Sequence, residues 1–327
     1  MAKACIAALA EQLAYQKIWY TDIRFSRDCY LGLSVIAGAT KQILLGPGVT
    51  DPYTKHPAMT AATLATLDEL SDGRAILGLG AGGHGFRELG IERKLPVAAL
   101  RETVEIVRAL WRGESVDYQG KVASVSKGKL TFAPSRSDIP IYFATHGEQV
   151  SRLAGKLADG VLVANTLEPR MLSFYLDRIR EGMVAVDRDG ADFEFGLWVE
   201  ACISDDHEAA FGVMRRRMAS RLIGQYPNWA YLTELGIDLP PEFVEIAAEK
   251  DQKLVDEAAR AMPSHAVGLT VLAGNAEQVA NQLSRVMRPE VGSITIRPHA
   301  APGEPLDRVI QAFAEDVMPR VNQLTGG

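Results

Sequence analysis

Short apolar runs alternate with helical patterns along most of this chain, and that alternation constrains the fold more than any other feature. The runs ILLGPGV, AILGLG and DGVLVAN are largely apolar, and a helical pattern follows each of them. A strand without polar alternation is buried on both faces, as in a parallel sheet covered by helices. Because parallel strands need crossover connections, the rhythm predicts an α/β fold with a helix between successive strands.

Seven strands of this kind can be counted, whereas a TIM (β/α)8 barrel needs eight. The first barrel strand is missing before the helix that opens the chain, unless Ala266–Gly274 fills the gap. We expect a single barrel domain over residues 1–327, a length at which α/β barrels occur as one domain. Two segments interrupt the rhythm: a hairpin excursion at 113–134 and a helical insertion at about 205–263.

Charge and composition exclude several classes of protein. The net charge of -6 argues against a nucleic-acid binder, and the densest basic run, Arg215–Arg217, is interpreted as part of a solvated helix face. The three scattered cysteines form no CxxC pair, which disfavours a zinc site or disulfide framework and fits a reducing cytoplasm. Neither a signal peptide nor an apolar run of about 18 residues is present, so we expect a cytoplasmic protein without a membrane span.

The run GLGAGGHG, at 78–85, contains the spacing GxGxxG. A dinucleotide-binding fingerprint would need a helix that starts within the glycines and an acidic residue about 20 positions later. Here the next clear helix starts near Val97. The alternative is a glycine-rich strand end that lets a flat ligand lie against the backbone.

The predicted strand ends share small or polar residues. They are Asp22; Gly48, Val49 and Thr50; Gly80, Ala81 and Gly82; Thr145, His146 and Gly147; and Asn165 and Thr166. In a parallel barrel these ends lie on one rim, where active sites gather. The set suits a planar cofactor with polar edges, and the free N–H groups of the helix after Thr145 could hold a phosphate. Each residue alone is also an ordinary turn residue.

None of the six histidines is paired at i, i+4, and no HExxH motif occurs, so no metal site is predicted. His146 and His84 fall on the predicted rim, where an imidazole could transfer a proton near neutral pH. For any single histidine a structural role is the commoner alternative. The sequence has no GxSxG motif, so covalent hydrolysis is not indicated.

The stretch GVTDPYTKHPAMTAATLATLDELSDGRAILGLGAGG resembles the signature region of the luciferase-like family, and LAGKLADGVLVAN and AGNAEQVANQL resemble later segments of it. That family includes bacterial luciferase, FMN-dependent monooxygenases and coenzyme F420-dependent reductases. The sequence is most similar to the methylenetetrahydromethanopterin reductase branch. The resemblance implies a TIM barrel, a homodimer, and a flavin ring lying against Gly48-Val49-Thr50. It also implies a cis peptide bond between Gly48 and Val49, with Thr50, Asp51 and Tyr53 lining the site.

The implied activity is hydride transfer between coenzyme F420 and a small organic substrate. Asp22 would orient the substrate or the ring edge, and His146 or His84 would transfer a proton. Thr145, His146 and Gly147 would hold the phosphate or ribityl chain. Ile23 stands where deazaflavin-dependent alcohol dehydrogenases of the family carry a histidine, so the resemblance does not extend to alcohol oxidation by that residue. Two alternatives stay open: an FMN-dependent monooxygenase that uses molecular oxygen, and a non-catalytic flavin-binding protein.

Overall fold

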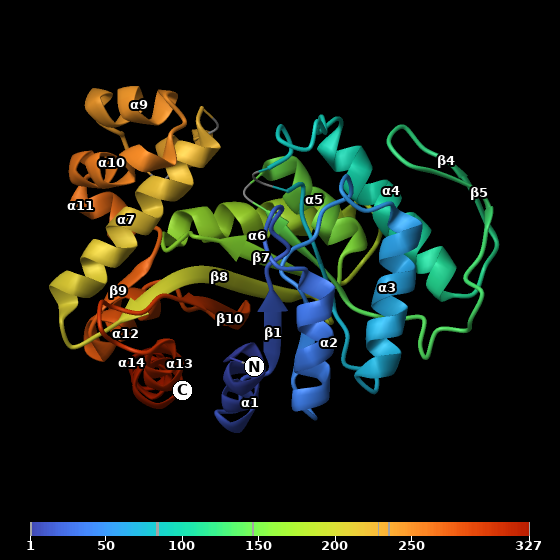
Figure 1. Cartoon of the computed structure of the whole chain (residues 1–327), viewed down its shortest axis with the longest axis horizontal. Helices are drawn as coiled ribbons and strands as arrows, with labels where there is room; N and C mark the ends of the chain where they lie inside the picture. Colours follow the sequence, from blue (N-terminus) through green and yellow to red (C-terminus); the bar gives the residue numbers. More distant parts are fainter. Residues whose placement is uncertain (1, 83–84, 146, 228, 235, 327) are drawn as a thin grey trace. The chain divides into compact units, whose positions relative to one another are not determined.

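A computed structural model describes residues 2–82, 85–145, 147–227, 229–234 and 236–326 (Figure 1). The chain divides into two compact units, which are described separately. The first consists of Met1–Leu162 and Arg178–Glu194, and the second of Val163–Asp177 and Phe195–Gly327. The expectation of one barrel domain over 1–327 stays a prediction.

The first unit alternates helices with short parallel strands. Its elements are α1 (Ala2–Gln12), β1 (Lys17–Tyr20), α2 (Cys29–Ala39), β2 (Leu44–Pro47), α3 (Pro57–Leu70), β3 (Leu77–Leu79), α4 (Pro96–Trp111), β4 (Val116–Gln119), β5 (Ser124–Gly128), β6 (Ile141–Thr145) and α5 (Glu148–Leu157). β7 (Gly160–Ala164) begins in this unit and α6 (Pro169–Val184) ends in it.

The strands of the first unit pair in chain order. β1 pairs with β2 in parallel, from Lys17 opposite Leu44 to Tyr20 opposite Pro47. β2 is linked to β3 by bridges that include Thr50 with Leu79, and β3 pairs in parallel with β6. Because the pairing is parallel throughout, the residues that follow β1, β2, β3 and β6 come out at the same edge of the strands. Fully buried side chains such as Leu45, Leu64 and Phe143 pack around them.

Local sequence explains where these helices begin. The ring of His56 caps α3 by accepting the N–H of Ala58, and Pro57 occupies the first turn, where a missing N–H costs nothing. Pro96 opens α4 in the same way. Cβ atoms at Gly46 and Gly78 would lie 1.9 Å from Ile76 O and 2.2 Å from Pro47 O, so only glycine allows β2 and β3 to approach so closely.

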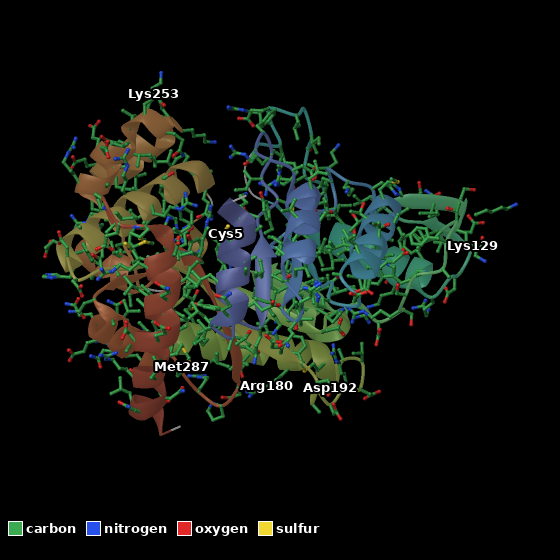
Figure 2. The ribbon with its side chains drawn as sticks, turned by 60° about the horizontal axis from the view of Figure 1, so that its bottom comes forward. Cys5, Lys129, Arg180, Asp192, Lys253 and Met287 are labelled. Carbon is green, nitrogen blue, oxygen red and sulfur yellow. The ribbon has the colours of Figure 1, made fainter. Side chains whose placement is uncertain are left out.

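The predicted hairpin excursion is confirmed, because β4 and β5 form an antiparallel pair. Figure 1 shows this pair beside α4, and Figure 2 shows Lys129 at its outer edge. Glu102 of α4 anchors the turn: its buried carboxylate accepts the backbone N–H groups of Lys121, Val122 and Ala123 at 2.8–2.9 Å. A buried carboxylate thus ties an exposed excursion to a core helix.

The second unit builds on three parallel strands and carries the predicted helical insertion. Its further elements are β8 (Glu194–Ile203), α7 (His207–Gln225), α8 (Ala230–Glu234), α9 (Pro241–Ala248), the 3-10 turn Gln252–Leu254, α10 (Val255–Ala261), α11 (Ser264–Gly268), β9 (Leu272–Gly274), α12 (Ala276–Ser284), β10 (Val291–Pro298), α13 (Leu306–Ala312), the π-helical turn Phe313–Val317 and α14 (Met318–Thr325). β8 pairs in parallel with both β10 and β9. Figure 2 shows Lys253 on the outer side of the insertion.

The seven predicted strands are all present, as β1, β2, β3, β6, β7, β8 and β10. The first ends at Tyr20, two residues before Asp22. The suggestion that Ala266–Gly274 replaces the missing first strand is wrong. Its first part is α11, which starts directly after Pro263, and its last three residues form β9, which pairs with β8. In the described part of the chain, no helix is both long and apolar enough to cross a membrane.

Candidate active site

Asp22 and Thr50 meet at the edge where the strands of the first unit end. Thr50 Oγ1 donates a 2.7 Å hydrogen bond to Asp22 Oδ2, although 28 residues separate the two. Thr50 is completely buried, and its backbone N–H and C=O bond to Gly78 and Gly80 on the next strand. The hydroxyl therefore cannot turn away easily, and it holds one carboxylate oxygen of Asp22 while Asp22 itself remains partly exposed.

Val49 lies over a surface made of glycines. The peptide bond between Gly48 and Val49 is cis, which confirms the prediction from the family resemblance. Cβ atoms built at Gly78 and Gly80 would approach the two methyl groups of Val49 to 3.0 and 2.8 Å, and one at Gly48 would approach Trp19 Cβ to 2.4 Å. Gly78 and Gly80 thus leave room for Val49, and Gly48 leaves room for Trp19; a side chain at Gly78 or Gly80 would press on Val49.

The loop from Asp51 to His56 is held by its own polar groups. The buried carboxylate of Asp51 accepts the N–H groups of Tyr53 and Thr54 and the hydroxyl of Thr54, each at 2.8 Å. Arg24 lies 3.4 Å from the second oxygen of the same carboxylate. The hydroxyl of Tyr53 donates to Lys94 O. These contacts give Asp51 and Tyr53 a structural role in shaping the loop.

Gly80, Ala81 and Gly82 follow β3. A Cβ at Gly80 would lie 3.7 Å from Ala144 O, which places the glycine next to the end of β6. Gly82 has a φ of +76°, a conformation that favours glycine, and its carbonyl accepts Arg93 Nη1 at 2.7 Å. A Cβ there would meet Phe86 at 2.4 Å, and the Arg24 guanidinium stacks 4.1 Å from the centre of that ring.

Thr145 and Gly147 bond to each other at the start of α5. The Thr145 hydroxyl accepts the Gly147 N–H at 3.0 Å, and Ser151 Oγ donates to Gly147 O at 2.9 Å. The N–H of Gly147 is therefore engaged within the loop. Glu148 in the first turn of α5 pairs with Arg152 at 2.6 Å. An anion bound at this helix end would therefore be repelled by the Glu148 carboxylate.

Asn165 and Thr166 belong to the second unit. Asn165 has a φ of +52°, is 2% exposed, and donates its backbone N–H to Trp198 O on β8. Its side-chain oxygen is buried and has no hydrogen-bond partner within the described chain. The Thr166 hydroxyl donates to Ala164 O. An amide held in a strained conformation with an unused acceptor is suited to bind a donor group of a ligand.

The two histidines predicted to transfer protons, His84 and His146, lie outside the described residues. Nothing in the structure therefore tests their roles. Among the residues that are described, no cluster of three His, Cys, Asp or Glu side chains could hold a metal ion.

Two residues near Asp22, Lys55 and Tyr30, were not predicted from the sequence as part of the site. The ammonium of Lys55 lies 3.8 Å from the centre of the Tyr30 ring and donates to Thr63 Oγ1 at 3.1 Å. Burial lowers the pKa of Lys55, and the charges of Asp28 and Asp22 oppose that effect. The Tyr30 hydroxyl is buried, which raises its pKa, and a hydrogen bond with Thr50 has a smaller, lowering effect on that pKa. Tyr30 gave no signal in the sequence, because an aromatic residue at helical spacing normally indicates core packing.

Comparison with known proteins assigns this chain to a family. A family model described as luciferase-like monooxygenase matches residues 4–291. A 5,10-methylenetetrahydromethanopterin reductase from Archaeoglobus fulgidus is 28% identical over 317 residues, covering 96% of this chain and 93% of the relative. An F420-dependent glucose-6-phosphate dehydrogenase from Amycolatopsis mediterranei is 24% identical over 339 residues, covering 97% and 93%.

A solved structure extends the likeness to three dimensions. The coenzyme F420-dependent tetrahydromethanopterin reductase from Methanopyrus kandleri superimposes with a TM-score of 0.85 at 25% identity, covering 98% of this chain and 95% of that one. The fold class is therefore α/β, that of a TIM barrel with insertions. The chain belongs to the luciferase-like monooxygenase family.

Proposed function

We propose that this protein is an oxidoreductase that transfers a hydride between coenzyme F420 and a small organic substrate. Two relatives that cover nearly the whole chain are named for reactions of F420 or of a methanopterin, and the structural neighbour is F420-dependent. The single observation that carries the proposal is the bond between Asp22 and Thr50 at the edge of the surface formed by Gly48, Val49 and Gly80.

The residues present fit a flat, polar-edged ring. The residues directly after β2 and β3 are small, and Gly78 and Gly80 leave room for Val49 beside them. Asp22 offers a carboxylate with one oxygen fixed by Thr50 and the other free of that bond. The bound cofactor would supply the hydride chemistry. The protein would supply a support for the ring, from Gly48 and Val49, and a fixed acceptor, from Asp22.

The role of Asp22 is to position a donor group. A carboxylate held by a buried hydroxyl loses little orientational freedom when a ligand N–H or O–H bonds to its free oxygen, so the substrate or the ring edge is held in one orientation. Gly80, Ala81 and Gly82 would complete the wall beside it. Thr145 and Gly147 would hold the phosphate or ribityl chain. In the second unit, Asn165 and Thr166 are separate candidates for cofactor binding.

We further propose that the protein forms a homodimer through the outer face of α2 and α3. Leu31 and Val35 on α2 are 72% and 55% exposed, and Met59 and Leu70 on α3 are 57% and 55% exposed. A hollow of about 270 Å³ lies between these helices, lined by residues that include Tyr30 and Leu70. An apolar patch of this kind on a folded protein marks a contact surface.

Cofactor turnover with and without oxygen tests the proposed activity. Reduced F420, with 5,10-methylenetetrahydromethanopterin as the first substrate, should be oxidised at the same rate in air and under nitrogen. A monooxygenase would instead need reduced FMN and would stop without oxygen. Binding of F420 without turnover of any of a panel of electrophilic carbon substrates would support the third alternative, a flavin-binding protein without activity.

A further inference from the structure

A buried carboxylate in the second unit faces more positive charge than it can neutralise. Glu200, on β8, is 1% exposed. Its Oε1 accepts Arg217 Nε of α7 at 3.1 Å, and Arg297 Nη1 lies 3.5 Å from the same oxygen. Glu200 and Arg297 are directly paired residues of β8 and β10, so their side chains share one face of the sheet. Arg217 belongs to the basic run interpreted from sequence as a solvated face, and for Arg217 that interpretation is wrong.

Arg221 adds a third guanidinium one turn further along α7. The residue is 8% exposed, and its Nε, Nη1 and Nη2 are all buried. Its described hydrogen-bond partner is the phenol of Tyr231, a neutral group, and no carboxylate among the described residues bonds to the three nitrogens. Arg221 lies close enough to Tyr231 for its charge to lower the pKa of that phenol, against the larger effect of burial, which raises it. Arginine presents five donors and is almost never buried unpaired, so this side chain is missing an anionic partner.

The local charge balance points the same way. Burial lowers the pKa of Arg297, and Arg217 and Arg221 lower it further while Glu200 opposes them, so the three guanidinium groups act on one another. Together Arg217, Arg221 and Arg297 carry three positive charges against the one negative charge of Glu200. Arg217 and Arg297 are each 30% exposed, so water screens part of their charge, whereas the charge of Arg221, which is 8% exposed, costs free energy unless an anion offsets it.

A rearranged internal network is the rival explanation. Glu200 Oε2 is itself buried without a hydrogen-bond partner in the described chain, and a small rotation could bring it to Arg221. One carboxylate would still leave two charges uncompensated. Nearby, His299 cannot supply the missing anion: burial lowers its pKa to about 4, so it is a neutral group at pH 7.

We propose that Arg221, with Arg217 and Arg297, forms an internal oxyanion-binding site that takes the phosphate or carboxylate group of a small organic substrate. Planar guanidinium groups bind such oxyanions through two parallel hydrogen bonds, which fixes the orientation of the ligand as well as its charge. The assignment of the oxyanion to the substrate rests on the proposed function. The existence of the site does not.

Calorimetric titration of the full-length protein with inorganic phosphate, and separately with malonate, tests the site itself. The wild type should bind at least one of them with 1:1 stoichiometry, and Arg221→Gln should weaken that binding at least tenfold. The matched control is Arg216→Gln on the same helix, because Arg216 is exposed and pairs with Asp256 at 2.8 Å; its affinity should stay unchanged. If Arg221→Gln fails to fold, Arg221→Lys keeps the charge but loses the paired donors and should still bind more weakly than wild type.

Two results would overturn the proposal. Absence of binding by the wild type to both anions would show that the three arginines form a closed network with Glu200. Equal binding by wild type and Arg221→Gln would place any bound anion elsewhere. A third measurement assigns the oxyanion: phosphate should leave F420 affinity unchanged. If phosphate competes with F420, and Arg221→Gln weakens F420 binding, the site serves the cofactor and the substrate assignment is wrong. If the wild-type protein binds phosphate but shows no F420-dependent turnover, that result would contradict only the proposed function.

Discussion

Replacement of Gly80 by alanine should disturb cofactor binding through Val49. The new Cβ would lie 2.8 Å from Val49 Cγ2, whereas its next neighbours, Ala144 O and Ala144 Cβ, are at 3.7 and 3.8 Å. Because carbon atoms in contact lie about 3.5–4.0 Å apart, Val49 has to move by about 1 Å while Ala144 need not move at all. The displacement is therefore directed at the residue on which we place the ring.

The size of the effect follows from the stiffness of valine. A β-branched side chain has few allowed χ1 values, and an off-rotamer χ1 costs about 0.5–1.5 kcal/mol. We expect the free energy of unfolding to fall by about 1 kcal/mol, within the range for overpacking. A support displaced by about 1 Å should also raise the Kd for F420 about tenfold, which corresponds to about 1.4 kcal/mol.

Fluorescence titration with F420 measures the change in Kd, and two further variants locate its cause. Gly212→Ala is the matched control, since Gly212 is exposed on α7, a Cβ there has no neighbour within 4 Å, and the affinity should stay at the wild-type value. Adding Val49→Ala to Gly80→Ala removes the clashing methyl group and should recover part of the lost affinity. Unchanged F420 affinity in a folded Gly80→Ala protein would refute the argument that Val49 and the glycines support the ring.

Three further predictions follow from named contacts. Thr50→Val removes a donor to a carboxylate, a bond worth about 1.5–3 kcal/mol, so turnover should fall at least about tenfold and the midpoint of thermal unfolding should fall by a few degrees; wild-type rates would contradict the role of Asp22. Burial raises the pKa of Glu102, but the hydrogen bonds from three backbone N–H groups together lower it by more, so the pKa is below its usual value. Its stabilisation is therefore present at neutral pH and lost in acid, and urea unfolding should show the deficit of Glu102→Gln narrowing below about pH 4; a constant deficit would contradict this. Leu31→Glu should convert the dimer to monomer in sedimentation at micromolar concentration, whereas Val184→Glu, equally exposed on α6, should not; a Leu31→Glu dimer would exclude this face.

The sequence predicted the strands well because each is buried and largely apolar. It also brought Asp22 and Thr50 to one edge, since parallel strands in chain order present their ends together. What it could not predict was which glycines are crowded. Gly80 and Gly147 look alike as residues after a strand, yet only the first has a neighbour that excludes a side chain. That difference depends on where Val49 lies, which is a tertiary property.

Charged residues were harder to place than apolar ones. Arg217 lies in a basic run on a helix, a pattern typical of a solvated face, but its partner Glu200 is on a strand of the core. Arg221 is buried as well, although nothing in the local pattern distinguishes it from Arg216. Helical periodicity indicates which residues share a face, and the face that is buried depends on the elements packed against it. For the same reason, the sequence did not indicate that Lys55 and Tyr30 lie beside Asp22.

Selective cofactor binding is the most direct test of the proposed F420 dependence. The purified protein should be titrated with coenzyme F420 and with FMN under the same conditions, with fluorescence for both ligands. We predict saturable 1:1 binding of F420, at least tenfold tighter than FMN, and weaker F420 binding in Gly80→Ala than in Gly212→Ala. Tight binding of FMN without binding of F420 would contradict the account and support an oxygen-dependent monooxygenase.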